Sequence, residues 1–91
     1  MYQIDFKHPG NVYFIGIGGI SMSGFAQLLH EYGFTVHGSD AHESKITDHL
    51  ESLGIHIIYG QAFENITKDI DFVVYTAAIH PDNPEYRAAK E

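Results

Sequence analysis

The chain has 91 residues and no cysteine, which excludes disulfides, thiolate metal sites and cysteine nucleophiles. Its 12 acidic residues outnumber 5 basic ones, and a formal charge of −7 argues against binding to nucleic acid or to an anionic membrane surface. The length suits one domain with one modest core, no apolar run approaches the roughly 20 residues of a membrane span, and a secretory signal is not recognisable at the start. We therefore expect a cytoplasmic protein.

The first half of the chain alternates between strand and helix patterns. Residues 11–17 form a continuous apolar run, typical of a central parallel strand buried on both faces. Apolar residues then recur at helical spacing between Met22 and Leu29, which predicts an amphipathic helix. Residues 34–38 follow as a second strand. Gly33 before it is expected to end the helix with a positive φ.

The second half continues the alternation. Ser44 is a plausible N-cap for a helix over residues 46–53, which Gly54 ends in the same way as Gly33 ends the first helix. Residues 56–59 and 71–76 are further strands. Asn83-Pro84-Glu85 opens a last helix, with proline at its first position and glutamate in its first turn.

This order of elements predicts an α/β fold with a parallel sheet covered by helices on both faces. Right-handed crossovers would give a Rossmann-like sheet of about four strands in the order 3-2-1-4. The pattern of a helix runs up to the last residues, so we expect residues 1–91 to be a single N-terminal domain of a longer protein.

Three motifs carry the functional hypothesis, and the first is the glycine-rich segment after the first strand. Gly16, Gly18 and Gly19 precede Ser21, Met22 and Ser23 at the start of the helix. Residues without a Cβ permit a tight strand-to-helix turn, and the free N–H groups of the helix start attract a phosphate. The alternative is a turn that only packs the helix closely on the sheet.

The second and third motifs also follow strands. Ser39 and Asp40 lie at the end of the second strand, where Rossmann-type sites place an acidic residue that binds a ribose, although both residue types also cap turns. The third motif follows the fourth strand and includes the small residues Thr76, Ala77, Ala78 and Ile79. They allow a ligand to approach the backbone, but a loop that needs turn-forming residues explains them equally well.

Other chemistry finds little support. The seven histidines do not have the spacing of a zinc site, so we expect no metal site. No GxSxG or GxxxxGK[ST] motif is present, so the segment is not expected to activate a nucleoside triphosphate.

Together, FIGIGGISMSGFA, VHGSD and VVYTAAIHPDNPE resemble the N-terminal domain of the Mur ligase family, over residues 11–90. The resemblance implies a cytoplasmic three-domain ligase of peptidoglycan biosynthesis, and the A-I-x-x-x-N-P-E segment favours the branch that adds L-alanine to UDP-N-acetylmuramate. The first domain would hold the UDP part of that substrate. The missing domains would bind ATP, Mg²⁺ and L-alanine, so no cofactor and no catalysis are expected of this segment alone.

The resemblance assigns the residues of all three motifs to the nucleotide sugar. The glycine-rich loop would lie near the phosphates, Ser39 and Asp40 by the ribose or uracil, and Thr76 to Ile79 along the other wall. Three residues depart from the common family pattern: Ser21 replaces a glycine, Ala77 a serine or threonine, and Gln61 a histidine.

Three alternatives remain open at this point. A ligase that attaches recycled tripeptide to the same nucleotide sugar would look similar in this domain. An NAD-binding module would share the fold and the first two motifs. A regulatory domain without catalysis is the third alternative.

Overall fold

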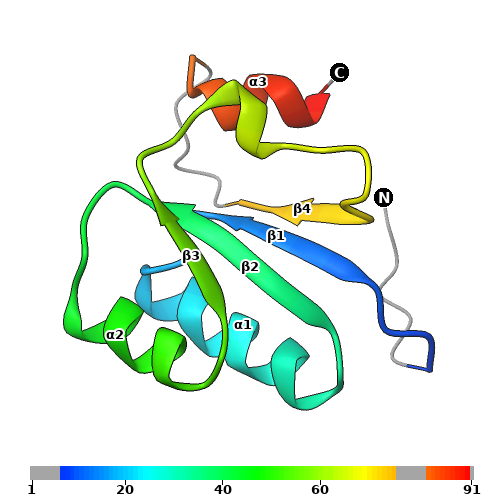
Figure 1. Cartoon of the computed structure of the whole chain (residues 1–91), viewed down its shortest axis with the longest axis vertical. Helices are drawn as coiled ribbons and strands as arrows, with labels where there is room; N and C mark the ends of the chain where they lie inside the picture. Colours follow the sequence, from blue (N-terminus) through cyan, green and yellow to red (C-terminus); the bar gives the residue numbers. More distant parts are fainter. Residues whose placement is uncertain (1–6, 76–81, 91) are drawn as a thin grey trace.

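A twisted sheet of four parallel strands forms the centre of the computed structural model, which describes residues 7–75 and 82–90. The strands are arranged in the order β3-β2-β1-β4, as Figure 1 shows. Their bounds are β1 (Asn11–Ile15), β2 (Thr35–Asp40), β3 (His56–Tyr59) and β4 (Phe72–Val74). The predicted fold class and strand order are therefore confirmed.

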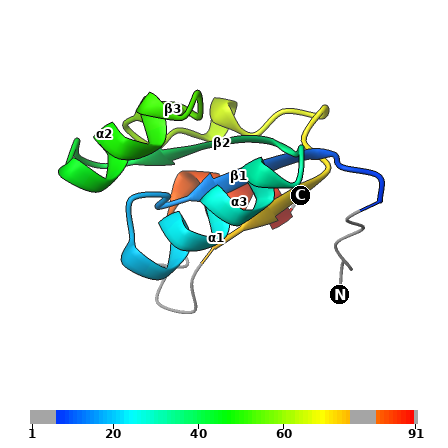
Figure 2. The same cartoon turned by 90° about the horizontal axis from the view of Figure 1, so that it is seen from below.

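Helices cover both faces of this sheet. Within residues 7–75 and 82–90, the α-helices are α1 (Ile20–Glu31), α2 (Lys45–Ser52) and α3 (Pro84–Lys90), and η1 (Phe63–Asn65) is a short 3₁₀ helix. Helices α1 and α2 lie on one face, and η1 and α3 lie on the other (Figures 1 and 2). No helix in the described part of the chain is both long and apolar enough to cross a membrane.

The apolar core lies between the sheet and the helix pair α1–α2. Val12 and Phe14 of β1 point to this side and pack with Ala26 and Leu29 of α1 and Leu50 of α2, all fully buried. Side chains alternate across a strand, so Tyr13 points to the opposite face, toward α3. The core side of the sheet is thus mainly apolar, with Asp40 at its carboxyl edge, whereas the opposite face carries several polar side chains.

Local signals in the sequence predicted most element ends. Gly33 and Gly54 have φ of 93° and 94° after α1 and α2. Ser44 caps α2, accepting a hydrogen bond from the Thr47 N–H, while the Ser44 N–H donates to the Thr47 hydroxyl at 2.7 Å. Pro84 is the first residue of α3, as expected.

The ends of three strands differ from the prediction. β1 stops at Ile15 instead of residue 17, because Gly16 turns the chain with a φ of 78°. β2 continues to Asp40, two residues beyond the predicted end, and pairs with β1 up to Ser39. β4 covers only Phe72–Val74, and η1 was not predicted.

Candidate functional site

The glycine-rich segment joins β1 to α1 at the carboxyl end of the central strand. Gly16 has a φ of 78°, a conformation that side chains with a Cβ rarely adopt. Gly19 is the N-cap of α1, and no side chain caps the helix there. The Gly19 N–H donates to the carbonyl of Gly16 at 3.2 Å, which closes the turn. The residues after Gly19 thus begin a helix whose first N–H groups have no cap.

The end of β2 holds this turn in place. The carbonyl of Ser39 accepts from the N–H groups of both Gly16 and Ile17, each at 2.9 Å. The next residue, Asp40, accepts from the Gly18 N–H through its carboxylate Oδ2 at 2.8 Å. Three successive N–H groups of the loop are therefore bonded to β2 and are not directed at a ligand.

The N–H groups left for an anion are those of Ile20, Ser21 and Met22, in the first turn of α1. An α-helix leaves its first N–H groups without internal partners, and its dipole places partial positive charge there. Ser21 is exposed, so its hydroxyl is accessible beside them. The Ser23 hydroxyl donates to the Ile20 carbonyl at 2.9 Å. This helix start is the anion-attracting part of the site.

Several predicted site residues have structural contacts that the sequence did not indicate. Met22 is buried and packs in the apolar core, with its Cβ and Cγ close to Gly19 of the loop. Ser39 is fully buried, and its hydroxyl donates to Glu85. This placement does not support direct contact between the Ser39 side chain and a ligand. Thr76, Ala77, Ala78 and Ile79 lie outside the described residues.

Asp40 is half-buried instead of free at the end of the strand, because its carboxylate turns back onto the loop. A Cβ on Gly18 would come within 2.7 Å of Asp40 Oδ2 and 3.0 Å of Thr47 Cγ2. The small size of Gly18 therefore makes room for Asp40 and Thr47. The structure accounts for this glycine without a ligand.

A buried carboxyl group that the sequence analysis did not single out lies on the α3 face of the sheet, next to Ser39. Glu85 is fully buried and accepts from the Tyr13 hydroxyl at 2.7 Å and the Asn65 amide at 2.5 Å. Burial is also the main cause that raises the pKa of the Tyr13 hydroxyl. The signal available in the sequence was Glu85 at the start of a helix, which indicated only a favourable dipole interaction.

Gln61, which departs from the family pattern, lies beside this carboxyl group. Its side-chain carbonyl accepts from Asn83 at 2.7 Å, and its amide donates to the Ser39 hydroxyl at 3.5 Å. Gln61 thus connects the loop after β3 with the start of α3.

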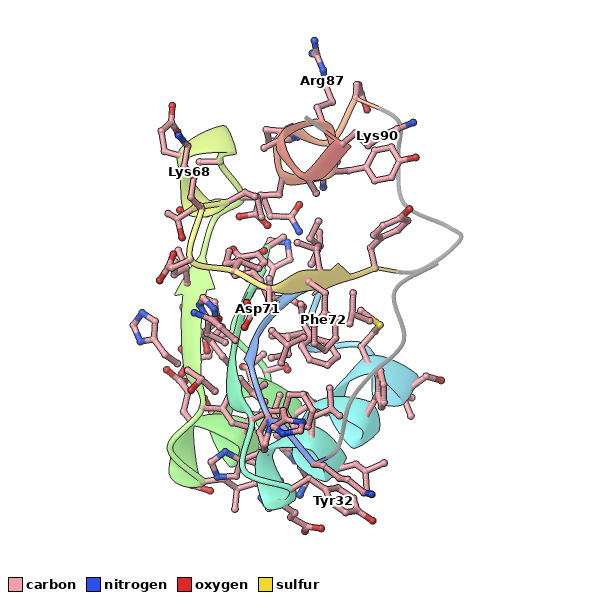
Figure 3. All side chains as sticks on the ribbon, turned by 90° about the vertical axis from the view of Figure 1, so that its right-hand side faces the viewer. Tyr32, Lys68, Asp71, Phe72, Arg87 and Lys90 are labelled. Atoms are coloured by element: carbon pink, nitrogen blue, oxygen red, sulfur yellow. The ribbon has the colours of Figure 1, made fainter. Side chains whose placement is uncertain are left out.

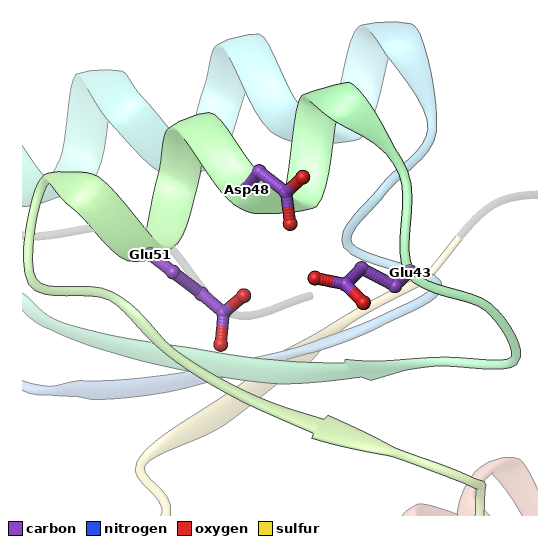
Figure 4. Close-up of side chains that lie close together, drawn as sticks. All are labelled: Glu43, Asp48 and Glu51. Atoms are coloured by element: carbon purple, nitrogen blue, oxygen red, sulfur yellow. The ribbon is translucent and has the colours of Figure 1, made fainter.

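One group of three possible metal ligands occurs among the described residues, and it consists of Glu43, Asp48 and Glu51 (Figure 4). All three are exposed carboxylates in or directly before α2. The hydrogen bond and the negative charge of Asp48 raise the pKa of Glu43. Exposed acidic groups are common on protein surfaces without a bound ion, so this group by itself does not indicate a metal site.

A depression lies between β4 and α3, with a volume of about 680 Å³. Figure 3 shows the side chains around it, including Lys68, Phe72 and Lys90. Tyr75 contacts Tyr86 edge-to-face near it, with ring centroids 4.9 Å apart. The described residues of its lining include no cluster of groups that suggests catalysis.

Comparison with known proteins resolves the family. The model of the "Mur ligase family, catalytic domain" matches residues 11–91. The chain belongs to the Mur ligase family. The expected resemblance is therefore confirmed, and it extends over nearly the whole chain.

Individual Mur ligases show how closely the chain is related. It is 65% identical over its whole length to the UDP-N-acetylmuramate–L-alanine ligase of Lachnoclostridium phytofermentans, and 62% identical over 99% of its length to that of Agathobacter rectalis. It covers only 19% and 20% of those two proteins. The chain thus spans about a fifth of the length of these relatives.

Two solved Mur ligase structures have the same fold. UDP-N-acetylmuramate-alanine ligase from Thermotoga maritima superposes with a TM-score of 0.81 and 38% identity, over 88% of this chain and 18% of that one. UDP-N-acetylmuramate:L-alanyl-gamma-D-glutamyl-meso-diaminopimelate ligase from Neisseria meningitides gives a TM-score of 0.80 and 29% identity, over 89% and 26%. The fold alone therefore does not distinguish these two kinds of ligase.

Proposed function

We propose that the chain is the UDP-N-acetylmuramate-binding part of a cytoplasmic, ATP-dependent ligase that adds L-alanine to this nucleotide sugar in peptidoglycan biosynthesis. The names of the two ligases that are 65% and 62% identical to the chain support this substrate and this amino acid. Because the chain covers about a fifth of those proteins, ATP, Mg²⁺ and L-alanine are assigned to the rest of a longer enzyme. The segment alone is expected to bind the nucleotide sugar and to catalyse nothing.

The uncapped start of α1 is the observation that carries this proposal. It lies at the carboxyl edge of a parallel sheet, where α/β proteins bind ligands. The pyrophosphate would accept from the N–H groups of Ile20, Ser21 and Met22 and from the Ser21 hydroxyl, beside the bare backbone of Gly19. Backbone donors suit an acidic chain, because they bind an anion without lysine or arginine.

The other predicted residues have supporting roles in this proposal. Gly16 and Gly18 shape the turn, Ser23 stabilises the first helical turn, and Ser39 and Asp40 hold the loop on β2. The segment of Thr76, Ala77, Ala78 and Ile79 remains the proposed opposite wall.

The position of Asp40 disfavours the dinucleotide alternative. A Rossmann-type NAD site needs an acidic side chain free to accept from a ribose hydroxyl. Here the carboxylate accepts from Gly18 at 2.8 Å, within the protein itself. Of the two solved structures, the L-alanine ligase of Thermotoga maritima is 38% identical to the chain and the tripeptide ligase of Neisseria meningitides is 29% identical. The higher identity favours the L-alanine ligase activity.

Titration of the ¹⁵N-labelled chain tests the assignment. UDP-N-acetylmuramate should shift the amide signals of Gly19, Ser21 and Met22 more than an equal concentration of NAD does. A stronger response to NAD would overturn the proposal. The chain mixed with ATP, Mg²⁺, UDP-N-acetylmuramate and L-alanine should release no phosphate, and turnover above a blank would contradict the assignment of catalysis to the rest of the enzyme.

A charge variant at Ser21 separates ligand binding from helix stability. Ser21→Asp places a negative charge at the positive end of α1, which stabilises the helix but repels a pyrophosphate. Binding should fall at least tenfold while the melting temperature stays constant or rises. Ser21→Asn is the matched neutral control and should bind within a few-fold of the wild type. Equal affinities of the Asp and Asn variants would refute phosphate binding at this helix.

A further inference from the structure

Glu85 brings a carboxyl group into the interior on the α3 face of the sheet. It is fully buried, although it is the second residue of a short helix. Its oxygens accept from the hydroxyls of Tyr13 and Ser39, the side-chain amide of Asn65 and, at 3.3 Å, the N–H of Ala62. None of these four partners carries a positive charge. Burying a carboxyl group is costly, so this complete set of donors indicates a specific role.

One of the four partners leads directly to the glycine loop. The Ser39 hydroxyl donates to Glu85, while the Ser39 carbonyl accepts from the N–H groups of Gly16 and Ile17, both at 2.9 Å. Ser39 therefore joins α3 to the loop through one residue of β2. The Tyr13 hydroxyl donates to the same carboxyl group at 2.7 Å and also lies beside the Ser39 hydroxyl, but its hydrogen bonds among the described residues do not include the glycine loop.

A second connection reaches the same serine from the start of α3. Asn83 accepts from the N–H groups of Glu85 and Tyr86, at 2.9 and 3.1 Å, and so caps the helix. Its amide donates to Gln61 at 2.7 Å, and Gln61 donates to the Ser39 hydroxyl at 3.5 Å. The start of α3 is thus tied to Ser39 by two routes.

We propose that Glu85 is a positioning residue that sets the Gly16–Gly18 turn through Ser39, and thereby sets the affinity of the α1 start for the nucleotide sugar. The effect on affinity rests on the proposed function, whereas the effect on the turn does not. Because Ser39 links two segments that lie far apart in the sequence, a displacement of α3 would be transmitted to the phosphate-binding turn. Glu85 itself does not touch the ligand.

Two hydroxyl deletions separate positioning from general stabilisation. Ser39→Ala and Tyr13→Phe each remove one hydroxyl from the same carboxyl group, but only Ser39 also holds the loop. Amide hydrogen exchange in the ligand-free chain should accelerate at least tenfold at Gly16 and Ile17 in Ser39→Ala, relative to Tyr13→Phe. Affinity for UDP-N-acetylmuramate should fall at least fivefold in Ser39→Ala and less than twofold in Tyr13→Phe.

A double-mutant cycle with Glu85→Ala tests whether the carboxyl group acts through Ser39. The double variant should bind no more weakly than Glu85→Ala alone, because both changes break one connection. Glu85→Gln, which retains an acceptor and the side-chain shape, should restore most of the affinity. Should Glu85→Ala not fold, the exchange rates of Glu85→Gln, Ser39→Ala and Tyr13→Phe still decide the question.

The two readouts keep this proposal distinct from the proposed function. A wild-type chain that does not bind UDP-N-acetylmuramate would count against the proposed function, while exchange at Gly16 and Ile17 would still report on the turn. Equal exchange and equal affinity in Ser39→Ala and Tyr13→Phe would overturn the positioning role. Additive losses in the cycle would also overturn it.

Discussion

Substituting Gly18 by alanine should destabilise the chain through Asp40. The added Cβ would lie 2.7 Å from Asp40 Oδ2 and 3.0 Å from Thr47 Cγ2, both too close for ordinary contact. The carboxylate sits at the end of a flexible side chain, so it would move and lose its 2.8 Å hydrogen bond from the Gly18 N–H. A hydrogen bond to a charged group contributes about 1.5–3 kcal/mol, and partial exposure of this one lowers its share to about 1 kcal/mol.

Crowding at Thr47 adds a smaller cost, since its methyl group has to shift by a few tenths of an ångström. We therefore expect a total loss of about 1–2 kcal/mol in the free energy of unfolding. For a domain of this size each kcal/mol lowers the melting temperature by about 4–8 °C. Thermal and urea unfolding of Gly18→Ala measure the loss directly.

Measuring the effect of Gly18→Ala in a chain that also carries Asp40→Ala tests whether the cost comes from the Asp40 carboxylate. With the carboxylate removed, the nearest contact of a Cβ at position 18 is Thr47 Cγ2 at 3.0 Å, so Gly18→Ala should cost about 0.5 kcal/mol or less there. Gly24→Ala is the matched control within α1, because a Cβ there has no neighbour within 4 Å. It should stabilise the chain by about 0.5–1 kcal/mol. The same cost for Gly18→Ala with and without Asp40 would refute this account of the glycine.

Three further predictions follow from other parts of the chain. Gly38→Ala should lower the free energy of unfolding by about 2–3 kcal/mol, because the added Cβ would come within 2.4 Å of the Phe14 carbonyl oxygen on the neighbouring strand. An unchanged midpoint of urea unfolding would contradict this. Burial lowers the pKa of His37 below 6.5, so the folded state keeps it neutral. Stability should accordingly decline as the pH falls below about 6.5, and His37→Gln should flatten that decline. Glu43→Gln should raise the melting temperature at pH 7 and low salt, because it removes the repulsion between Glu43 and Asp48. This gain in melting temperature should vanish as the pH falls through the raised pKa of Glu43, because the wild-type side chain is then protonated as well.

The sequence by itself determined the architecture. The largely apolar run from Asn11 to Ile17 is typical of a strand buried on both faces, and the helical spacing from Met22 to Leu29 indicates which side of α1 packs on the sheet. Ser44 and Pro84 marked helix starts through local hydrogen bonding and a fixed φ. These signals depend on only a few neighbouring residues, so they can be recognised in the sequence without knowledge of the fold.

The site was visible only in part. Glycines after a strand and before a helix indicated the loop, because the required backbone geometry is local. The sequence could not show which N–H groups of the loop remain for a ligand. Those of Gly16 to Gly18 are bonded to Ser39 and Asp40, which belong to another strand. The sequence analysis ended β2 at residue 38, whereas the strand continues to Asp40. Because side chains alternate along a strand, the longer strand puts Ser39 on the same face as His37, which is the α3 face.

Only the tertiary structure decided the role of Glu85. In the sequence it is a glutamate in the first turn of a helix, where solvent exposure is the rule. In the fold, its carboxyl group accepts hydrogen bonds from the hydroxyls of Ser39 and Tyr13, which lie 46 and 72 positions away on two adjacent strands. No local pattern encodes such a meeting, because it depends on how α3 packs on the sheet after the strands have paired. The sequence therefore determines the elements and the loop, and packing decides which polar groups support the loop from beneath.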